Sequence, residues 1–313
     1  MLGIVQGLTE FLPISSSAHL SIIPKLLDFR TPELAFEVLL HFGTLAAVML
    51  YFARDLWAFV LCLVAPSVLG AERARARRRQ LSLLVIASIP AAIFGYLLQD
   101  WADAQTSRPL RSAVWLIITT GILIAAERWD RSRRARPTAA DQLAVAAHGS
   151  APSHEQGHGP PAADPQVRLA PETARPMTRA EIQRQRRRAS VERPDEQHPN
   201  RAEKELERLP LPKALGIGLA QALALVPGTS RSGVTISAGL FEGISREAAA
   251  RFSFLLSIPA ILGAGMLKLG DLSSATESPA QLTVGFLAAA VSGFLAVSFL
   301  IRLLRTRTLW PFI

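Results

Sequence analysis

The sequence is poor in cysteine and in lysine, and both shortages narrow what the protein can be. Cys62 is the only cysteine among 313 residues, which excludes an internal disulfide and a cysteine-based metal site. Of the 34 basic residues, 30 are arginines and four are lysines. Many of the arginines stand in short clusters beside apolar runs, a distribution that favours membrane topology over a nucleic-acid partner.

The apolar residues make up half of the chain but show little of the amphipathic period of helices in soluble proteins. A helix that crosses a membrane needs about 20 apolar residues. We therefore expect an all-α integral membrane protein. The apolar runs of roughly this length lie at about 36–60, 81–99, 110–127, 246–267 and 281–301.

Arginine clusters follow the first, third and last of these runs, whereas the alternate loops are short and nearly balanced in charge. Loops on the cytoplasmic side of a membrane carry an excess of Lys and Arg. Placing the clusters in the cytoplasm makes every loop consistent with simple alternation across the membrane. The clusters comprise Arg73, Arg75, Arg77, Arg78 and Arg79, then Arg128, Arg131, Arg133, Arg134 and Arg136, and finally Arg302, Arg305 and Arg307.

One long segment differs in kind from the apolar runs. Residues 131–210 contain 10 of the 21 prolines and no Phe, Trp or Tyr. Such a composition cannot bury enough apolar surface to offset the entropy of ordering the chain. We expect 128–210 to be a disordered, basic cytoplasmic linker, in which Thr178–Glu181 is a capping box that could start a short helix. Its histidines could also suggest a metal site, although a solvated polar linker explains them as well. The three histidines considered for such a site are His148, His154 and His158.

A kinked pattern, in which hydroxyl residues follow a proline inside an apolar stretch, occurs twice. A constant offset of 214 carries Pro13 onto Pro227 and Ser16 onto Ser230. The topology returns each kinked segment to the side on which it starts, and each half is too short to cross the membrane.

We therefore expect two re-entrant hairpins, 1–30 and 212–242, that enter from opposite faces. The chain would then consist of two membrane repeats, 1–127 and 211–313, on either side of the linker. Inverted repeats with broken helices place a site where the breaks meet.

The first kink gathers residues able to do acid–base chemistry. Gln6 and Glu10 are four apart and share one face of a helix, which Pro13 ends. His19 stands one turn beyond Ser16 on the next helix. Ser15, Ser16 or Ser17 can cap that helix, whose free backbone N–H groups also favour an anion. Glu10, with Gln6, could hold a divalent cation, because hard cations take oxygen ligands.

The second kink offers groups that bind an anion. Pro227 and Gly228 form the turn, and Arg231 supplies a planar guanidinium suited to a phosphate. Hydroxyls and a helix cap come from Thr229, Ser230 and Ser232. Together the two kinks hold an anion clamp and an acid–base group, which suits phosphoryl chemistry on a phosphorylated lipid.

Each of these residues also has a plainer interpretation. Hydroxyls in membrane helices commonly bond back to the backbone, and an arginine near an apolar run can extend to the interface. Glu10 would be hydrated if residues 1–20 lay at the membrane surface, whereas at depth its charge is costly. His41, alone on an apolar helix, is interpreted as a packed, hydrogen-bonded histidine.

At these residues the chain resembles a known family. The stretch Gly3–His19 is similar to the glutamate-rich motif of undecaprenyl-pyrophosphate phosphatases of the bacitracin-resistance type. The stretch Pro227–Thr235 is similar to their second signature. The resemblance covers residues 1–127 and 212–313 and leaves the linker out.

The resemblance implies a hydrolase that converts undecaprenyl pyrophosphate to undecaprenyl phosphate and inorganic phosphate. This reaction regenerates the lipid carrier for peptidoglycan and other wall polymers. The family implies a divalent cation, Mg²⁺ or Ca²⁺, and a site that opens outward from the bacterial plasma membrane. Carried over residue by residue, Gln6 and Glu10 match the cation positions, Ser16 the proposed nucleophile, His19 the motif histidine and Arg231 the arginine that binds pyrophosphate.

The chain departs from the family pattern in three places. Gln6 stands where many members have Glu, so Glu10 is expected to carry more of the cation binding. The linker is long for the family. The second repeat has two spans after its hairpin whereas the first has three, so the family's last helix is expected to be missing.

A transporter or flippase for an anionic prenyl lipid is the alternative function, because inverted repeats with broken helices are typical of transporters. Glu10 and His19 would then form a proton relay. The seryl cluster beside an acid and a base favours the phosphatase, since a transporter does not require it. A scaffold whose linker binds anionic headgroups is a weaker third interpretation. The sequence leaves open whether the protein forms a homodimer.

Overall fold

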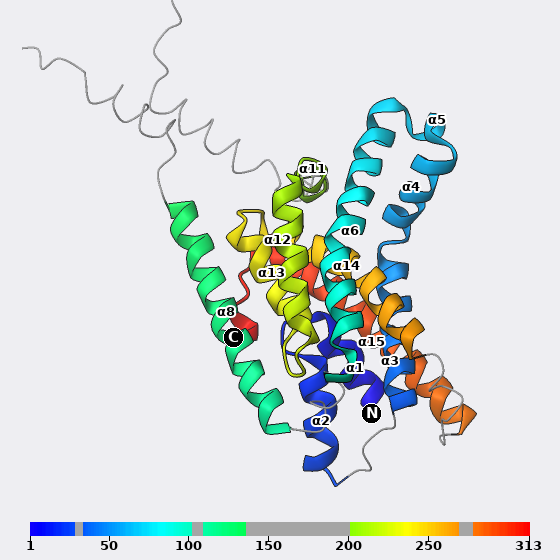
Figure 1. Cartoon of the computed structure of the whole chain (residues 1–313), viewed down its shortest axis with the longest axis vertical. Helices are drawn as coiled ribbons and strands as arrows, with labels where there is room; N and C mark the ends of the chain where they lie inside the picture. Colours follow the sequence, from blue (N-terminus) through cyan, green and yellow to red (C-terminus); the bar gives the residue numbers. More distant parts are fainter. Residues whose placement is uncertain (29–33, 102–108, 136–200, 269–277) are drawn as a thin grey trace, which may run out of the picture. The chain divides into compact units, whose positions relative to one another are not determined.

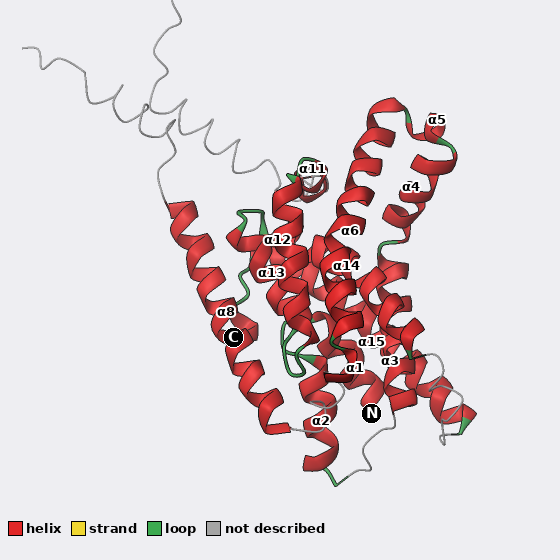
Figure 2. Ribbon diagram, in the orientation of Figure 1, coloured by secondary structure: helices red, strands yellow, loops and turns green. Residues whose placement is uncertain are grey.

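A computed structural model describes residues 1–28, 34–101, 109–135, 201–268 and 278–313. These residues form helices and loops, and no strand occurs among them (Figure 2). Nearly all of them belong to one compact unit, Met1–Arg133 with Asn200–Ile313, while the second unit, Arg134–Pro199, lies almost wholly outside the described residues. The all-α expectation is therefore confirmed for the part of the chain that is described.

The helices are labelled along the chain in Figure 1. The first group is α1 (Leu2–Phe11), α2 (Ser16–Leu26), α3 (Leu34–Tyr51), α4 (Ala53–Val64), α5 (Pro66–Leu69), α6 (Ala71–Leu97) and α8 (Pro109–Ala135). The second group is α11 (Arg201–Glu207), α12 (Leu211–Ala222), the 3₁₀ turn η1 (Leu223–Leu225), α13 (Arg231–Phe241), α14 (Arg246–Leu267), α15 (Pro279–Thr306) and the 3₁₀ turn η3 (Trp310–Phe312).

Five of the described helices, α3, α6, α8, α14 and α15, are long and apolar enough to cross a membrane. Each of them overlaps one of the five apolar runs of the sequence. One face of α15 also exposes large apolar side chains at helical spacing, which suits contact with lipid. These side chains are Val284, Leu287, Val291, Leu295 and Phe299. The protein is a multi-pass membrane protein.

Several boundaries differ from those expected. The first apolar run is interrupted at Phe52, between α3 and α4, so it is not one helix. Asp55 lies in the first turn of α4 and forms ion pairs with Arg77 at 3.0 Å and Arg251 at 3.4 Å. The arginines from Arg73 onward, expected in a loop, lie in the first turns of α6.

The linker is shorter than the expected 128–210. Helix α8 continues to Ala135, because Glu127 and Asp130 pair with Arg246 of α14 at 2.6 and 2.7 Å. At the other end α11 packs Ala202 and Leu206 into the core, and Leu209 just beyond the helix is buried with them. These apolar residues have helical spacing in the sequence, but the composition of the segment around them favours a disordered linker. The expected features at His148, His154, His158 and Thr178–Glu181 lie outside the described residues.

Small residues allow α1 and α3 to pack closely along α15, the three helices that lie side by side in Figure 1. A Cβ atom on Gly7 would lie 1.9 Å from the Ser292 hydroxyl, and one on Gly43 would lie 2.6 Å from the Phe286 carbonyl oxygen. Only glycine permits so short a separation between helices, as is common in membrane proteins.

Helix α14 holds the end of α1 in place. The Phe11 ring packs edge-on against Phe254 of α14, with 5.4 Å between ring centroids. Both side chains are almost fully buried, and an edge-to-face aromatic pair contributes about 0.5–1.5 kcal/mol beyond the area it buries. The polar end of α1, with Glu10, is therefore fixed next to α14 by apolar packing.

Candidate active site

The first kink is a short turn between α1 and α2. Leu12 has an extended backbone with ψ of 142°, as expected for a residue before proline, and α1 ends there. Ser15 caps α2 by accepting a hydrogen bond from the Ala18 N–H at 3.4 Å. Of the three serines that were candidates for this cap, Ser15 is the one that forms it. The Ser16 hydroxyl is therefore left for other contacts.

The second kink forms a similar turn between η1 and α13. Val226 is extended before Pro227, and Gly228 has a φ of +93°, a conformation that other residues adopt only with strain. Ser230 caps α13 by accepting a hydrogen bond from the Gly233 N–H at 3.1 Å. Among the hydroxyl residues of this motif, Ser230 is thus the one that forms the expected helix cap.

The two caps correct the expected register between the motifs. Ser15 and Ser230 lie 215 positions apart, one more than the two prolines, because the second turn has one residue more before its cap. Ser16 therefore corresponds to Arg231 rather than to Ser230. Each of these two residues is the first of its helix, so the same position supplies a hydroxyl in one motif and a guanidinium in the other.

Direct contacts join the two motifs. The Gly228 N–H donates to the Ser17 hydroxyl at 3.2 Å, and the Ser232 hydroxyl donates to the Leu12 carbonyl at 3.1 Å. The third contact is an ion pair, with Arg231 Nη2 at 2.7 Å from Glu10 Oε1. Residues more than 200 positions apart in the sequence thus form one site.

Glu10 lies at the centre of this site and is buried. One carboxylate oxygen, Oε1, accepts from Arg231. The other, Oε2, accepts from the Ser16 hydroxyl at 2.6 Å and from the Gln6 side-chain amide at 2.9 Å. Charge-assisted hydrogen bonds of this kind are the stronger ones, and together they offset the desolvation of a buried carboxylate.

His41 of α3 is a site residue that the sequence interpretation missed. Its Nε2 lies 3.6 Å from Glu10 Oε2, and its Nδ1 lies 2.8 Å from the Glu37 carbonyl oxygen. Because a carbonyl only accepts, Nδ1 carries a hydrogen and the opposite ring nitrogen faces the carboxylate. A signal was present in the sequence, since Glu37, His41 and Thr44 form a polar stripe on one face of an apolar helix.

His19 is close to the site in sequence, and among the described site residues its ring contacts the backbone of Ser15 alone. Its Nδ1 lies 2.8 Å from the Ser15 carbonyl oxygen, one turn back on the same helix. The described residues place no partner at its Nε2, which leaves that nitrogen available to a ligand.

The other predicted hydroxyls differ in what they contact. Ser15, Ser17, Ser230 and Ser232 are engaged in helix capping, in contact between the motifs, or with one another. Thr229 is different, because its hydroxyl is buried and has no hydrogen-bond partner among the described residues. Of this group, Thr229 is therefore the residue whose hydroxyl is free to bind a ligand.

Thr229 is one of three site residues with an unsatisfied buried polar atom. The other two are Gln6, through Oε1, and Arg231, through Nη1. A buried polar group without a partner costs about 1–3 kcal/mol, so such groups are normally satisfied by a ligand, an ion or water. The site thus offers a ligand one acceptor, Gln6 Oε1, and two donors, Arg231 Nη1 and the Thr229 hydroxyl. Two of these residues, Gln6 and Arg231, also donate to the Glu10 carboxylate.

The donor set is compatible with a divalent cation. Among the described residues, no group of three His, Cys, Asp or Glu side chains could hold a metal ion. Mg²⁺, however, is commonly bound by one or two protein oxygens together with waters and substrate phosphates. Gln6 Oε1 is an unsatisfied oxygen next to Glu10, and these two side chains fit that pattern.

The arrangement has the geometry of an activated nucleophile. The Ser16 hydroxyl is within hydrogen-bonding distance of a carboxylate, and the carboxylate is in turn oriented by an arginine. The arginine also has a free N–H for an anion. Such a site can transfer a phosphoryl group by combining a base, a nucleophile and positive charge.

Comparison with known proteins agrees with this chemistry. The profile of a family described as bacitracin resistance protein BacA matches residues 1–149 and 184–313, including parts of the segment that the motif resemblance left out. The chain is 38% identical to an undecaprenyl-diphosphatase of Alcanivorax borkumensis, over 100% of this chain and 92% of that protein. It is 35% identical to the undecaprenyl-diphosphatases of Chlorobium phaeovibrioides and Geobacter sulfurreducens, over 100% of this chain and 90% and 91% of those proteins.

Proposed function

We propose that this chain, which belongs to the bacitracin resistance protein BacA family, hydrolyses undecaprenyl pyrophosphate to undecaprenyl phosphate and inorganic phosphate. It is a membrane hydrolase that recycles the lipid carrier for peptidoglycan synthesis. The observation that carries the residue-level proposal is the Ser16 hydroxyl 2.6 Å from Glu10 Oε2, with Arg231 2.7 Å from Oε1.

Ser16 is the nucleophile in this proposal. Its oxygen attacks the terminal phosphorus, its proton passes to Glu10 Oε2, and the bond from that phosphorus to the bridging oxygen breaks. Undecaprenyl phosphate leaves with the electron pair of that bond. Water then hydrolyses the phosphoserine and releases inorganic phosphate. The free Nε2 of His19 is the base for this water, since Nδ1 is held by the Ser15 carbonyl.

Positive charge and hydrogen-bond donors stabilise the transferring phosphoryl group. Arg231 Nη1 and the Thr229 hydroxyl, both buried and unsatisfied, donate to its oxygens. A divalent cation, Mg²⁺ or Ca²⁺, would be held by Gln6 Oε1 and Glu10, and it would neutralise charge on the pyrophosphate. Ser15, Ser17, Ser230 and Ser232 line the site and fix its shape.

The orientation in the membrane is part of the proposal. The two kinked segments, α1–α2 and η1–α13, enter from opposite faces as halves of an inverted repeat. The arginine-rich ends of α6 and α8 face the cytoplasm of the bacterial plasma membrane. The site opens outward.

The test is phosphate release from undecaprenyl pyrophosphate by purified protein in detergent. Ser16→Ala should lower turnover by more than about a thousandfold, the order of loss seen when a nucleophile is removed. The matched control is Ser21→Ala on the same helix, whose hydroxyl only donates to the Ala18 carbonyl at 3.1 Å. A chelator should abolish release, and added Mg²⁺ or Ca²⁺ should restore it.

Two results would contradict the proposal. Near-normal turnover of Ser16→Ala would show that water attacks the phosphorus directly. Complete lack of phosphate release by a folded wild-type sample, with every cation, would favour transport of the lipid over its hydrolysis.

A further inference from the structure

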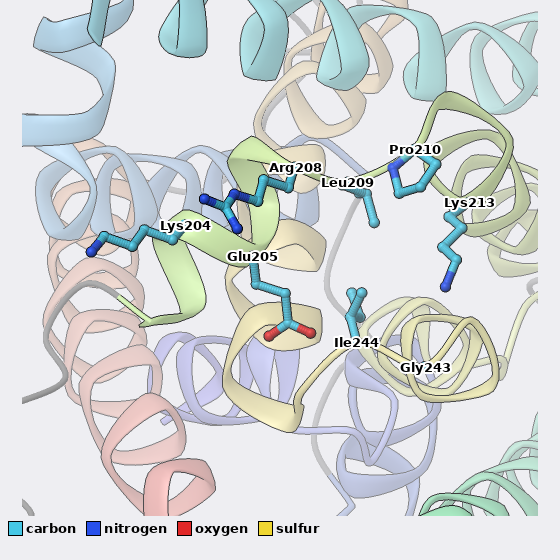
Figure 3. Close-up of a pocket in the computed structure, with 8 residues that line it drawn as sticks. All are labelled: Lys204, Glu205, Arg208, Leu209, Pro210, Lys213, Gly243 and Ile244. Carbon is cyan, nitrogen blue, oxygen red and sulfur yellow. The ribbon is translucent and has the colours of Figure 1, made fainter. Parts of the chain in front are cut away.

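A cavity lies apart from the phosphatase site, between α11, the start of α12 and the turn that follows α13. It has a volume of about 360 Å³ (Figure 3). Its lining includes Lys204, Glu205, Arg208, Lys213, Gly243 and Ile244. None of these residues has a role in the proposed reaction.

The charge of the lining is predominantly positive. Lys204, Arg208 and Lys213 are cationic, and Glu205 is the one acidic residue among the described residues that line the cavity. The Glu205 carboxylate is engaged by Ser245, whose backbone N–H donates at 2.8 Å and whose hydroxyl donates at 2.6 Å. The carboxylate is thereby committed to the start of α14, and three cations remain around the cavity.

Two of these cations are available to a ligand. Lys204 and Arg208 are exposed, and their side chains form no hydrogen bond or ion pair with the described residues. They stand four positions apart on the α11 side, while Lys213 extends from α12 on the opposite side toward the Gly243 turn (Figure 3). The Lys213 ammonium also donates to the Glu242 carbonyl.

The backbone carbonyls at the cavity's rim are already satisfied by arginines. Arg79 donates to the carbonyls of Glu207 and Leu209, and Arg133 donates to the Gly243 carbonyl at 2.7 Å. Arg79 and Arg133 belong to two of the three arginine clusters that the positive-inside rule places beside the cytoplasmic headgroups. The cavity therefore offers donors rather than acceptors, at the level of the lipid phosphates.

We propose that this cavity binds a phosphate-bearing anion through Lys204, Arg208 and Lys213. A guanidinium and two ammonium groups match the charge and the oxygen acceptors of a phosphate. Basic pockets between membrane helices on the cytoplasmic side bind anionic headgroups in this way. The phosphate comes either from the phosphodiester of an anionic lipid or from free inorganic phosphate.

The test compares full-length protein in phosphatidylcholine nanodiscs with and without phosphatidylglycerol, and in phosphatidylcholine nanodiscs with added inorganic phosphate. Thermal unfolding is measured as each anion is titrated, since a ligand of the folded state raises the midpoint. The cavity variant is Lys204→Gln/Arg208→Gln, which alters exposed side chains and leaves Lys213 on its carbonyl. The control is Arg73→Gln/Arg75→Gln, which removes the same charge from exposed positions on α6.

We expect the cavity variant to bind the anion about tenfold more weakly or worse, and the control to bind as wild type does. Loss of the phosphatidylglycerol effect identifies a lipid headgroup, and loss of the inorganic phosphate effect identifies a soluble anion. Phosphate bound at the phosphatase site contributes equally to wild type and variant, so their difference reports on the cavity alone. Equal losses in the variant and the control, or no loss in either arm, would overturn the proposal.

Discussion

Side chains from three other elements, as well as from its own helix, lie close to the Glu10 carboxylate. Gln6 precedes it on α1, Ser16 begins α2, His41 comes from α3 and Arg231 begins α13. Removing one partner of such a buried pair leaves the other charge uncompensated, which costs about 3–5 kcal/mol. Variants of these residues therefore need a folding control beside the activity measurement.

Arg231→Lys should lower phosphatase turnover by about a hundredfold to a thousandfold, the range seen when one stabilising donor is removed. The guanidinium uses Nη2 on Glu10 and keeps Nη1 for the phosphate, whereas an ammonium is a point charge that cannot span both positions. Steady-state phosphate release measures the effect. Thermal unfolding of the same sample separates loss of activity from loss of the folded state. Wild-type turnover in the lysine variant would refute the proposal that Arg231 contacts Glu10 and the phosphate at the same time.

His41→Ala should lower kcat by about tenfold and leave KM nearly unchanged, because the imidazole faces the carboxylate that acts on Ser16 rather than the lipid. His41→Gln is the matched variant, since its amide can place an N–H where Nε2 lies. We expect the glutamine to recover most of the lost kcat. A rise in KM with unchanged kcat would instead place His41 in substrate binding.

The motifs identified the polar residues of the site but not all of their contacts. Proline, glycine and serine act on the backbone within a few residues, so the turns and their capping could be predicted from local sequence. Which serine caps and which serine faces the carboxylate depends on one residue of register. His41 could not be assigned because its partner lies on another helix, 31 positions earlier in the chain.

Short helices with small residues on one face position this site. Helix α1 has ten residues and is held along α15 at Gly3 and Gly7, where a side chain would enter the partner backbone. Its C-terminal end is fixed by the Phe11 contact with Phe254. The position of Glu10 therefore depends on how closely α1 approaches α15.

Gly7→Ala should destabilise the protein by about 1–3 kcal/mol and reduce activity, because the new Cβ would meet the Ser292 hydroxyl at 1.9 Å and the Ala289 carbonyl oxygen at 2.6 Å. Thermal unfolding and phosphate release measure the two effects. Gly263→Ala in α14 is the matched control, since its added Cβ meets no atom within 4 Å from the other described parts of the chain. Equal stability of the two variants would contradict the close packing of α1 on α15.

Ion pairs connect segments that are far apart in the chain. Asp55 of α4 binds Arg77 of α6 and Arg251 of α14, and Arg77 also pairs with Glu203 of α11. These contacts attach α11 to the membrane helices, although it follows the long segment that separates the two halves of the sequence. The part of 128–210 closest to each membrane half is therefore part of the folded unit.

Replacing residues 136–199 with a short Gly/Ser linker should leave phosphatase activity and thermal stability near wild type, because no described residue of the site lies there. Removing all of 131–210 should lower the unfolding midpoint, since it deletes the buried Leu206 and Leu209 and the Arg133 contact with the Gly243 carbonyl. Activity and unfolding measured on both variants test this. Loss of activity in the shorter replacement would assign the segment a role in the reaction.

The sequence by itself determined the membrane class, the five apolar helices, the two kinked motifs and the candidate residues Glu10, Ser16 and Arg231. Each of these follows from composition, from periodicity, or from a proline, glycine or polar residue within a short stretch of chain. The tertiary structure alone decided that Ser16 corresponds to Arg231, that His41 faces Glu10 and that α11 belongs to the core. These depend on contacts between distant residues, and such contacts are set by the packing of whole helices rather than by local pattern.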